Sequence, residues 1–278
     1  MEEFFIGVNM SKILTYDGRP LDYGNIPNRS YRSKSWTGLS SLTGAHVWSD
    51  GTNIYYSYGA NQYVLNKSTS TWSSKTWTGL TNFYGFDVWS DGTDIYMSNS
   101  SYQYVLDKAE SKWTSKSWNG YSNVTGRYIW RSVLGYHYSN GSTQYTLDKS
   151  TSTWSTQTWT GLTSFNGNQI WNAGSYQYYS RAGEQYALTP GTSTWTSQSW
   201  SGLLSFYGNN VWTFGTDIYY SSDSSQYVKN GTLWQPVSWG ISFDGENVWD
   251  VDGKKYMNNT YELLTTYPSG EYNFISHN

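Results

Sequence analysis

The side chains that most often carry catalysis or bind metals are few in this sequence. Its three histidines, His46, His137 and His277, share no spacing, and no acidic partner is predictable for any of them. The absence of cysteine excludes disulfides, thiolate nucleophiles and Cys-ligated metals. The segment Asp250-Val-Asp252-Gly253 comes nearest to a calcium loop but is too short for an EF-hand. We therefore expect no catalytic residue, no metal site and no cofactor.

Aromatic side chains are the abundant resource of the chain. They make up 19% of the residues, with 28 Tyr and 17 Trp, whereas charged residues make up 13%. Exposed rings could stack on the apolar faces of sugars, whereas each buried Trp would contribute up to ~4–6 kcal/mol to a core. One series recurs every 41 residues, with a sixth member 39 residues after the fifth: Trp36, Trp77, Trp118, Trp159, Trp200 and Trp239. Rigid recurrence favours the core, because identical neighbours must pack identically.

A fixed interval of this size is the signature of a structural repeat. Two further tryptophan columns keep the same register: Trp48, Trp89, Trp130, Trp171, Trp212 and Trp249 in one, and Trp72, Trp113, Trp154, Trp195 and Trp234 in the other. A glutamine column lies between them, at Gln62, Gln103, Gln144, Gln185 and Gln226. We expect its amides to bond the backbone of an adjacent loop as a structural clamp, with ligand contact as the alternative.

Each repeat contains four short segments of strand character with a turn signal between them. In the first repeat these are residues 45–49, 54–57, 62–67 and 72–77. Helical spacing is absent, and Gly, Asn, Asp and Ser come too often for a helix longer than one turn. Four short strands per 41 residues indicate the blade of a β-propeller.

The count of first strands predicts six blades in residues 31–267. The sixth blade lacks its fourth strand on the C-terminal side, while a fourth strand without a preceding blade stands at residues 31–36. Pairing these two ends closes the ring and leaves no open sheet edge. Residues 1–30 then form an N-terminal extension or anchor, and residues 268–278 form a tail. The alternative is a partial seventh blade built from residues 4–16 and the tail.

The N-terminal extension gives few structural signals. Residues 4–8 and 13–16 could each form a short strand, and residues 17–30 read as an irregular connection because they are rich in Gly, Pro and Asn. The first ten residues are acidic, with too short an apolar run for a secretory signal. No stretch approaches the length of a transmembrane helix.

The blades resemble the kelch repeat. The likeness rests on a third strand that runs into a Ser/Thr turn and a tryptophan, as in residues 103–113, and on a first hairpin of the form Asp91-Gly-Thr-Asp-Ile-Tyr96. It covers residues 31–267 and implies an all-β, six-bladed propeller of four-stranded antiparallel blades. Ser and Asn replace the kelch double glycine, as at Ser98-Asn99, so the chain would be a divergent branch. Residues 10–21 are weakly similar to the starts of phage tail and fibre proteins.

Enzymes built on related propellers carry motifs that this chain lacks. Oxidases with kelch-type blades hold copper at a cross-linked Tyr–Cys pair, and the sequence has no cysteine. Sialidases need an arginine cluster and Ser-x-Asp-x-Gly-x-Thr-Trp boxes, and no such box is present. The arginines are Arg19, Arg29, Arg32, Arg127, Arg131 and Arg181. We expect the protein not to be an enzyme, with a glycan-acting enzyme as the least favoured alternative.

The candidate binding residues stand where the repeats differ. One face of a propeller carries the connections between blades and the loops between second and third strands, and function tends to lie on such loops. The residue two before each first-strand tryptophan should ring the channel mouth: His46, Asp87, Tyr128, Gln169, Asn210 and Asn247. The loops between second and third strands add Tyr58, Tyr102, Arg181, Glu184 and Asp223. The alternative is unconstrained drift.

Charge and surface composition bound the partners. The net charge of −3, from 17 Lys and Arg against 20 Asp and Glu, gives no electrostatic footprint for nucleic acid or an anionic membrane. We expect no nucleic-acid partner and no membrane insertion. A surface rich in Ser, Thr, Asn and Gly is typical of an exported, carbohydrate-facing protein, yet no export signal is present. A phage component released by lysis would satisfy both observations, so we expect a virion or extracellular location.

The sequence therefore predicts a non-catalytic binding or adhesion propeller. We expect a structural or host-recognition protein of a phage tail, fibre or collar. Its partner would be another virion or cell-surface protein, bound through the termini or the variable face, with a glycan as a second candidate. The alternative function is a bacterial glycan-binding lectin with repeated sites between the blades.

Overall fold

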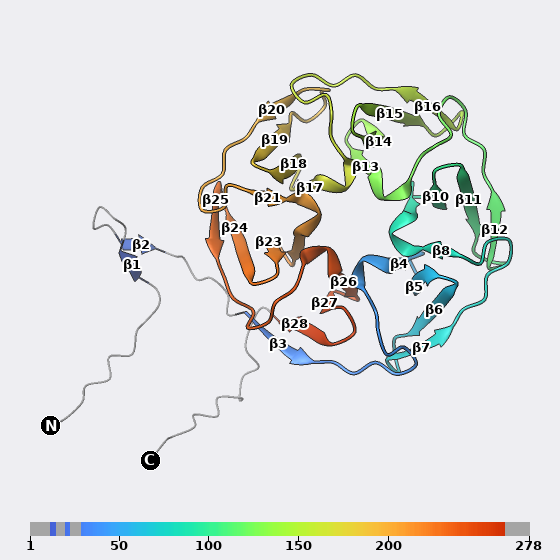
Figure 1. Ribbon diagram of the computed structural model, residues 1–278, viewed down its shortest axis with the longest axis horizontal. Helices are drawn as coiled ribbons and strands as arrows, with labels where there is room; N and C mark the ends of the chain where they lie inside the picture. The colour runs from blue at the N-terminus through green and yellow to red at the C-terminus, as the bar shows by residue number, and fades with distance from the viewer. Residues whose placement is uncertain (1–11, 15–19, 23–28, 265–278) are drawn as a thin grey trace, which may run out of the picture.

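The computed structural model describes residues 12–14, 20–22 and 29–264 of the chain. Six antiparallel sheets are arranged as blades around a common axis (Figure 1). In each blade the strands run in order from an inner strand next to this axis to an outer strand at the rim. The six-bladed all-β propeller predicted from the sequence is confirmed.

Five blades are continuous in sequence. Blade 1 consists of β4 (Val47–Ser49), β5 (Ile54–Gly59), β6 (Asn61–Asn66) and β7 (Thr71–Ser74). Blade 2 consists of β9 (Val88–Ser90), β10 (Ile95–Asn99), β11 (Tyr102–Asp107) and β12 (Lys112–Ser115). Blade 3 consists of β13 (Ile129–Ser132), β14 (Gly135–Asn140), β15 (Thr143–Asp148) and β16 (Thr153–Thr156). Blade 4 consists of β17 (Ile170–Ala173), β18 (Tyr176–Ala182), β19 (Glu184–Leu188) and β20 (Trp195–Ser197). Blade 5 consists of β22 (Val211–Phe214), β23 (Asp217–Ser222), β24 (Ser225–Asn230) and β25 (Leu233–Pro236).

Blade 6 joins the two ends of the chain, as predicted. Its strands are β26 (Val248–Val251), β27 (Lys254–Met257), β28 (Tyr261–Leu264) and, from the N-terminal side, β3 (Ser30–Ser33). Strand β3 pairs antiparallel with β28, with Ser33 opposite Tyr261. The join carries an ion pair in which the Arg32 Nε and Nη2 atoms donate to Glu262 at 2.9–3.0 Å.

The N-terminal segment differs in part from its prediction. Strands β1 (Lys12–Leu14) and β2 (Pro20–Asp22) pair with each other in a two-stranded sheet. The prediction of an irregular connection over residues 17–30 is therefore wrong at β2. Pro20 takes the first position of this strand, where proline is tolerated. Neither strand pairs with a blade. Residues 4–8 and the tail, which the seventh-blade alternative needs, lie outside the described residues.

The fourth strands end earlier than predicted. In blade 1 the strand ends at Ser74 instead of residue 77, because the repeated Trp-Thr-Gly segment pairs with the next blade. Strand β7 ends at Ser74, and the following residues run along the outer strand of the next blade. Thr78 donates its backbone N–H to the Ser111 carbonyl (3.1 Å), and the Trp113 N–H donates to the Thr78 carbonyl (2.8 Å). Matching parallel bridges recur at five junctions. The phrase therefore links neighbouring blades at the rim.

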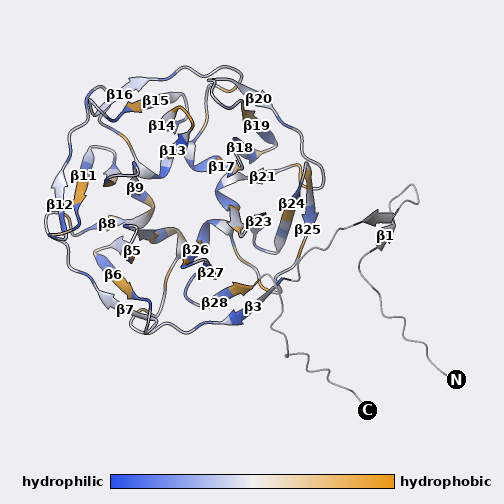
Figure 2. Cartoon of the chain, turned by 180° about the vertical axis from the view of Figure 1, so that it is seen from behind, coloured by the Kyte–Doolittle hydropathy of each residue, from blue (hydrophilic) through white to orange (hydrophobic). Residues whose placement is uncertain are grey.

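The tryptophans form the core between blades, as predicted. Each junction between two blades encloses one cluster of buried side chains. At the junction of blades 2 and 3, for example, the Trp154 ring lies between Trp89 (6.2 Å between ring centroids) and Trp118 (6.0 Å). Figure 2 shows the hydrophobic residues concentrated on strands such as β6, β11 and β24. These junctions bury the apolar surface that stabilises the ring.

The glutamine column forms the predicted clamps. Gln62 Nε2 donates to the carbonyl of Gly59 (2.7 Å) and to that of Phe83 (3.3 Å). Its Oε1 accepts a hydrogen bond from Ser57 (2.6 Å), whose Oγ accepts one from the Trp48 indole (2.8 Å). The same amide-to-carbonyl bonds recur at Gln103, Gln144, Gln185 and Gln226. Apart from Gln185 Oε1, which has no hydrogen-bond partner among the described residues, these buried polar groups are satisfied within the fold, and this disfavours ligand contact.

The two faces of the ring are defined by these contacts. The loop face carries the loops between second and third strands and the connections between blades. They meet where β8 (Phe83–Tyr84) pairs with β5 and β21 (Phe206–Tyr207) pairs with β18. The turn face carries the other two turns, which meet where Lys108 Nζ donates to the Asp50 carbonyl (2.8 Å).

Candidate functional site

The six residues predicted to ring the channel mouth form that ring on the loop face. Each ends a single turn of 3₁₀-helix just before an inner strand: η1 (Gly44–His46), η2 (Gly85–Asp87), η3 (Gly126–Tyr128), η4 (Gly167–Gln169), η5 (Gly208–Asn210) and η6 (Gly245–Asn247). The turns contact one another around the whole circle. All six residues therefore lie in the ring where the sequence placed them.

The glycine that opens each turn is the contact between neighbours. A Cβ at Gly126 would lie 2.0 Å from the Asp87 carbonyl oxygen, and one at Gly85 would lie 2.0 Å from that of His46. The other four glycines meet the preceding mouth residue in the same way. Only glycine permits this approach of two backbones. The mouth therefore has one repeated backbone and six different side chains.

Two of these side chains serve the ring itself. Gln169 Oε1 accepts a hydrogen bond from the Gly208 N–H at 3.0 Å, and Asn210 Oδ1 accepts one from the Glu246 N–H at 3.4 Å. Both bonds join a blade to its neighbour. At blades 4 and 5 the mouth residues are therefore structural.

Asp87 is the most unusual residue of the mouth. Its side chain is completely buried, and Asn99 Nδ2 donates to its Oδ2 at 3.0 Å. Arg127 Nε lies 3.6 Å from its Oδ1. Burial raises the pKa of Asp87 to about 6, although the charge of Arg127 works in the opposite direction. A buried carboxylate is costly, so its presence requires an explanation.

His46 lies in an aromatic environment that includes Phe86, the residue before Asp87. Its ring centroid is 4.8 Å from that of Phe86, 4.9 Å from Tyr58 and 5.7 Å from Tyr84. Burial lowers the pKa of His46, and the positive charge of Arg127 lowers it further. The imidazole is therefore neutral at pH 7, and its Nδ1 has no hydrogen-bond partner among the described residues.

Arg127 connects the two groups. Its guanidinium carbon lies 4.1 Å from the centroid of Phe86, within cation–π range, while its Nε faces Asp87. We refer to the resulting set as the mouth cluster, and it consists of His46, Tyr58, Tyr84, Phe86, Asp87, Asn99 and Arg127. Blades 1 to 3 contribute its members. It combines partly exposed aromatic rings with a fixed ion pair, a composition enriched at recognition surfaces.

The remaining predicted residues lie apart from this cluster. Tyr102 is exposed at the start of β11, and Arg181 faces Glu184 across the β18–β19 hairpin. Asp223 has a left-handed backbone (φ 51°) and donates its N–H to Asp244. All belong to the loop face, on blades 2, 4 and 5. The structure unites only Tyr58 of this group with the mouth.

Sequence reasoning missed Arg127, Phe86, Tyr84 and Asn99. Two of them, Phe86 and Arg127, directly precede a predicted mouth residue. That column also varies among the repeats and reads Ala45, Phe86, Arg127, Asn168, Asn209 and Glu246. Comparing the repeats at this position would have found the cation.

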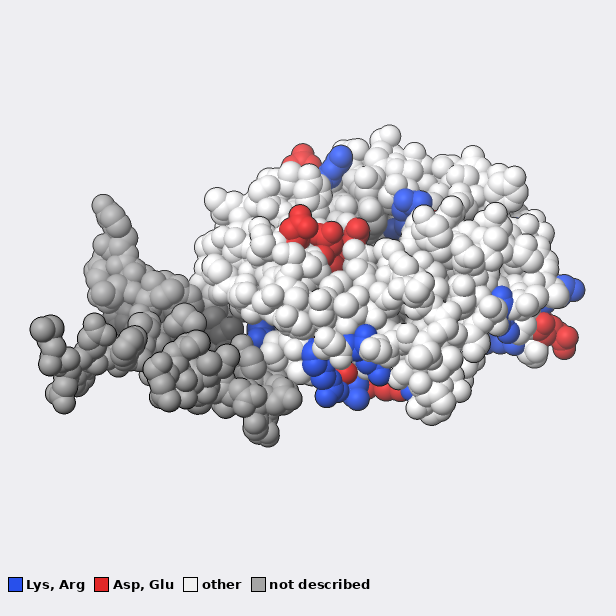
Figure 3. Space-filling model, turned by 60° about the horizontal axis from the view of Figure 1, so that its bottom comes forward, with Lys and Arg blue, Asp and Glu red and all other residues white. Residues whose placement is uncertain are grey.

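The remaining features of the described residues concern metal ligands, membrane-spanning helices and charged patches. No group of three or more His, Cys, Asp or Glu side chains within residues 29–264 is placed to hold a metal ion. In the part of the chain that the structure describes, no helix is long and apolar enough to cross a membrane. Charged side chains form only small clusters on a largely uncharged surface (Figure 3).

Comparisons with known proteins inform the fold. No protein-family model and no curated protein matches the sequence. The structure is similar to the extracellular domain of the putative one component system BT4673 from B. thetaiotaomicron, with a TM-score of 0.54 and 12% identity over 85% of this chain and 40% of that one. For the putative hybrid two component system BT3049 from the same organism, the TM-score is 0.50 with 11% identity over 90% and 36%.

These similarities bear on architecture alone. At such identity they support a propeller and do not single out the kelch repeat or a phage protein. The chain spans less than half the length of the domains that it matches. It is a six-bladed β-propeller, similar in fold to the extracellular domains of putative bacterial one-component and hybrid two-component systems.

Proposed function

We propose that this propeller is a non-catalytic recognition module that binds a protein partner through the mouth cluster of its loop face. The observation that carries the proposal is the buried Asp87 with its ion-pair partner Arg127, set among the rings of blades 1 and 2. A mouth residue needs no charge to build the ring, since Gln169 and Asn210 fill equivalent positions with neutral amides. The negative charge of Asp87 is therefore more than the scaffold needs, and we assign it and its aromatic surroundings to recognition.

The chemistry of the cluster favours a protein partner. Tyr and Arg are among the residues that dominate the binding energy of protein interfaces. Tyr58 is 48% exposed, and Tyr102 on the same face is 65% exposed. A partner that covered Tyr58 and Arg127 would gain apolar area and strengthen the ion pair by excluding water. The neighbours of similar fold are extracellular domains, which supports an extracellular location, and a virion location is the alternative that the experiment below tests.

The non-enzyme assignment remains part of the proposal. The mouth cluster contains one acid and one imidazole, but the acid is fully buried and paired with Arg127. Nothing in the cluster presents a nucleophile beside a base. The alternative of a lectin with equivalent sites would need the tryptophan columns at the surface, and they are buried between the blades.

The experiment is a binding assay with a matched control. Labelled protein is incubated with intact bacterial cells and, separately, with purified phage particles. We expect Tyr58→Ala and Arg127→Ala to weaken binding roughly tenfold or more, as hot-spot residues do. Tyr176→Ala, on the turn face, removes a ring of the same 48% exposure and should leave binding unchanged. Equal loss in all three variants would contradict the proposal, and binding to particles rather than cells would favour a virion component.

A further inference from the structure

The residues that directly precede the mouth residues carry two charges on opposite sides of the ring. This column reads Ala45, Phe86, Arg127, Asn168, Asn209 and Glu246, and Arg127 and Glu246 are its exposed members. The six turns contact one another in a closed circle, so η3 and η6, which hold the two charges, are three steps apart in either direction. The column therefore presents one positive and one negative group across the ring axis.

Both charged side chains lean toward the turn of the preceding blade. The Arg127 guanidinium carbon lies 4.1 Å from the centroid of Phe86 on η2, and Glu246 Oε2 accepts a hydrogen bond from Asn209 Nδ2 on η5 at 2.6 Å. The turns η2 and η5 are again three steps apart in the circle. The positive group therefore lies at blades 2 and 3, and the negative group lies opposite, at blades 5 and 6.

The counter-ion of the positive end is buried. Asp87 has a fully buried side chain, whereas the Arg127 side chain is 42% exposed. The guanidinium group therefore turns one side toward the buried carboxylate and leaves another side at the surface. Arginine pairs with carboxylates through two parallel hydrogen bonds, and the exposed side can offer such bonds to a partner.

Among the described residues, no lysine or arginine forms an ion pair with Glu246 at the negative end. The scaffold does not need this carboxylate, since Asn168 and Asn209 occupy equivalent positions with neutral amides. Two nearby amide oxygens, Asn209 Oδ1 and Asn247 Oδ1, have no hydrogen-bond partner in the part of the chain that the structure describes. The negative end therefore offers acceptors that suit a cationic group, which has donors only.

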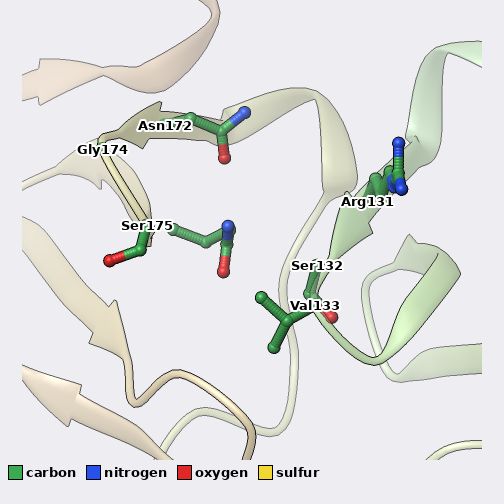
Figure 4. Close-up of a pocket in the computed structure, with 7 residues that line it drawn as sticks. Arg131, Ser132, Val133, Asn172, Gly174 and Ser175 are labelled. Atoms are coloured by element: carbon green, nitrogen blue, oxygen red, sulfur yellow. The ribbon is translucent and has the colours of Figure 1, made fainter.

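The hollow on the turn face does not offer a comparable charge. It lies between blades 3 and 4, and Arg131 is the charged residue among those that line it (Figure 4). However, the Arg131 guanidinium carbon lies 5.4 Å from the centroid of Tyr136, its partner in the strand register. This cation covers a ring of its own blade, so the mouth is the better candidate for binding a charged partner.

A short peptide segment is long enough to reach both ends of the mouth. Neighbouring turns have Cα atoms within 8 Å of each other, and opposite corners of a hexagon lie two sides apart. The backbones of η3 and η6 are therefore separated by roughly 16 Å or less, which about five extended residues span. The rings of Tyr58, Tyr84 and Phe86 adjoin the positive end and would contact apolar side chains of such a segment.

We propose that the protein partner enters the mouth through a short bipolar segment, in which an acidic side chain pairs with Arg127 and a basic side chain pairs with Glu246. This inference rests on the function proposed above and adds the chemistry of the partner. A segment with charges of one sign only would be attracted at one end of the mouth and repelled at the other. The mouth therefore selects for the presence of both charges as well as for apolar contact.

The test is a selection of mRNA-displayed random dodecapeptides on the immobilised full-length protein. Clones that lose binding to Tyr58→Ala are scored as mouth binders, and clones that bind Tyr58→Ala normally serve as the control set. We expect an acidic and a basic residue within about five positions of each other roughly threefold or more often in the mouth binders. Mouth binders without this enrichment would overturn the inference but leave the proposed function standing, whereas a selection that yields no mouth binder would contradict both.

Charge reversal at the negative end provides a second measurement. Glu246→Lys should weaken the selected mouth binders roughly tenfold or more without a change in the thermal midpoint, because it replaces attraction of the basic residue by repulsion. A new selection on Glu246→Lys should yield mouth binders with two acidic residues. Glu184→Lys reverses an exposed carboxylate of the loop face that lies outside the ring of turns, and it should leave the affinity unchanged. Equal affinities of the wild type and Glu246→Lys would refute the pairing.

Discussion

A buried carboxylate couples the stability of the ring to pH through Asp87. Burial raises its pKa from 3.8 to about 6. Between these two values the native state holds more protons than the unfolded state, so the free energy of unfolding falls as the pH rises from about 4 to 6. Above about pH 6 Asp87 is charged in both the native and the unfolded state, so its effect on the free energy of unfolding no longer changes with pH.

Asp87→Asn should therefore stabilise the protein at pH 7.5 by about 1–3 kcal/mol, because the amide removes the buried charge. The gain should disappear near pH 4, where Asp87 is itself neutral. Urea denaturation of both proteins across this range measures the difference. Asp223→Asn changes an exposed carboxylate of the same face and should show no such pH-dependent gain. A gain that persists at pH 4 would contradict the assignment.

His137 produces a dependence of opposite sign. Its Nε2 contacts Ser132 Oγ (2.8 Å) and its Nδ1 contacts Thr146 Oγ1 (2.7 Å), and burial lowers its pKa to about 4. In blade 1 the corresponding pair is Tyr55, whose hydroxyl donates to Asp50 at 3.0 Å. The repeat thus exchanges both members of a buried polar pair together.

Acid should weaken the wild-type protein through this histidine. Below pH 6.5 His137 is protonated in the unfolded state but stays neutral in the native state. This difference lowers the free energy of unfolding by up to about 3 kcal/mol by pH 4. The double variant His137→Tyr/Ser132→Asp restores the pair of blade 1 and should abolish this loss. The readout is the slope of the unfolding free energy against pH between 4 and 6.5, relative to wild type. An unchanged slope would exclude His137 as the source.

At the scale of elements, the glycine contacts of the mouth position one blade against the next. Gly126→Ala places a methyl group 2.0 Å from the Asp87 carbonyl oxygen and must separate η2 from η3. We expect a loss of about 1–3 kcal/mol, typical of overpacking. Gly183→Ala is the control, since nothing lies within 4 Å of its added Cβ. Thermal unfolding of the two variants measures the contrast, and equal effects would show that the approach of the backbones is unimportant.

The sequence predicted those elements whose contacts lie within one repeat. The glutamine clamps and inner strands follow from columns in register, because identical environments select identical residues. The short strands β8 and β21 did not follow, since Phe83 and Phe206 acquire strand pairing only by docking on a hairpin of the preceding blade. Arg127 also escaped, because it approaches Asp87 only when the turn before blade 3 docks on the turn before blade 2.

At the scale of the whole molecule, closure depends on contacts between the two ends of the propeller. Arg32 and Glu262 occupy the positions of Ser73 and Val64 in blade 1, as the strand registers show. Arg29 adds a second cation. Its guanidinium carbon lies 4.7 Å from the Tyr219 ring and 5.9 Å from that of Trp239. In blade 1 the equivalent tryptophan, Trp77, is covered by Lys75 of its own blade.

Breaking one partner of the terminal ion pair should cost more than replacing both. Arg32→Ser leaves Glu262, which is 5% exposed, without its partner, and should destabilise the ring by roughly 1–3 kcal/mol. The double variant Arg32→Ser/Glu262→Val installs the residues of blade 1 and should recover most of that loss. A double-mutant cycle in guanidinium chloride gives the coupling. Additive effects would show that the pair does not help to close the ring.

Because β3 pairs with β28, strand β3 cannot form its pairing until nearly the whole propeller has been synthesised. The ribosome releases Ser33 long before it makes Tyr261, the residue opposite it. At about 5–20 residues per second, the interval is roughly 10–50 s. Throughout that time an outer strand has no sheet to join, while five blades assemble behind it. The ring therefore closes last, when β28 pairs with β3, the strand of the propeller that was synthesised first. A chain that ends before β28 would be left with an open ring.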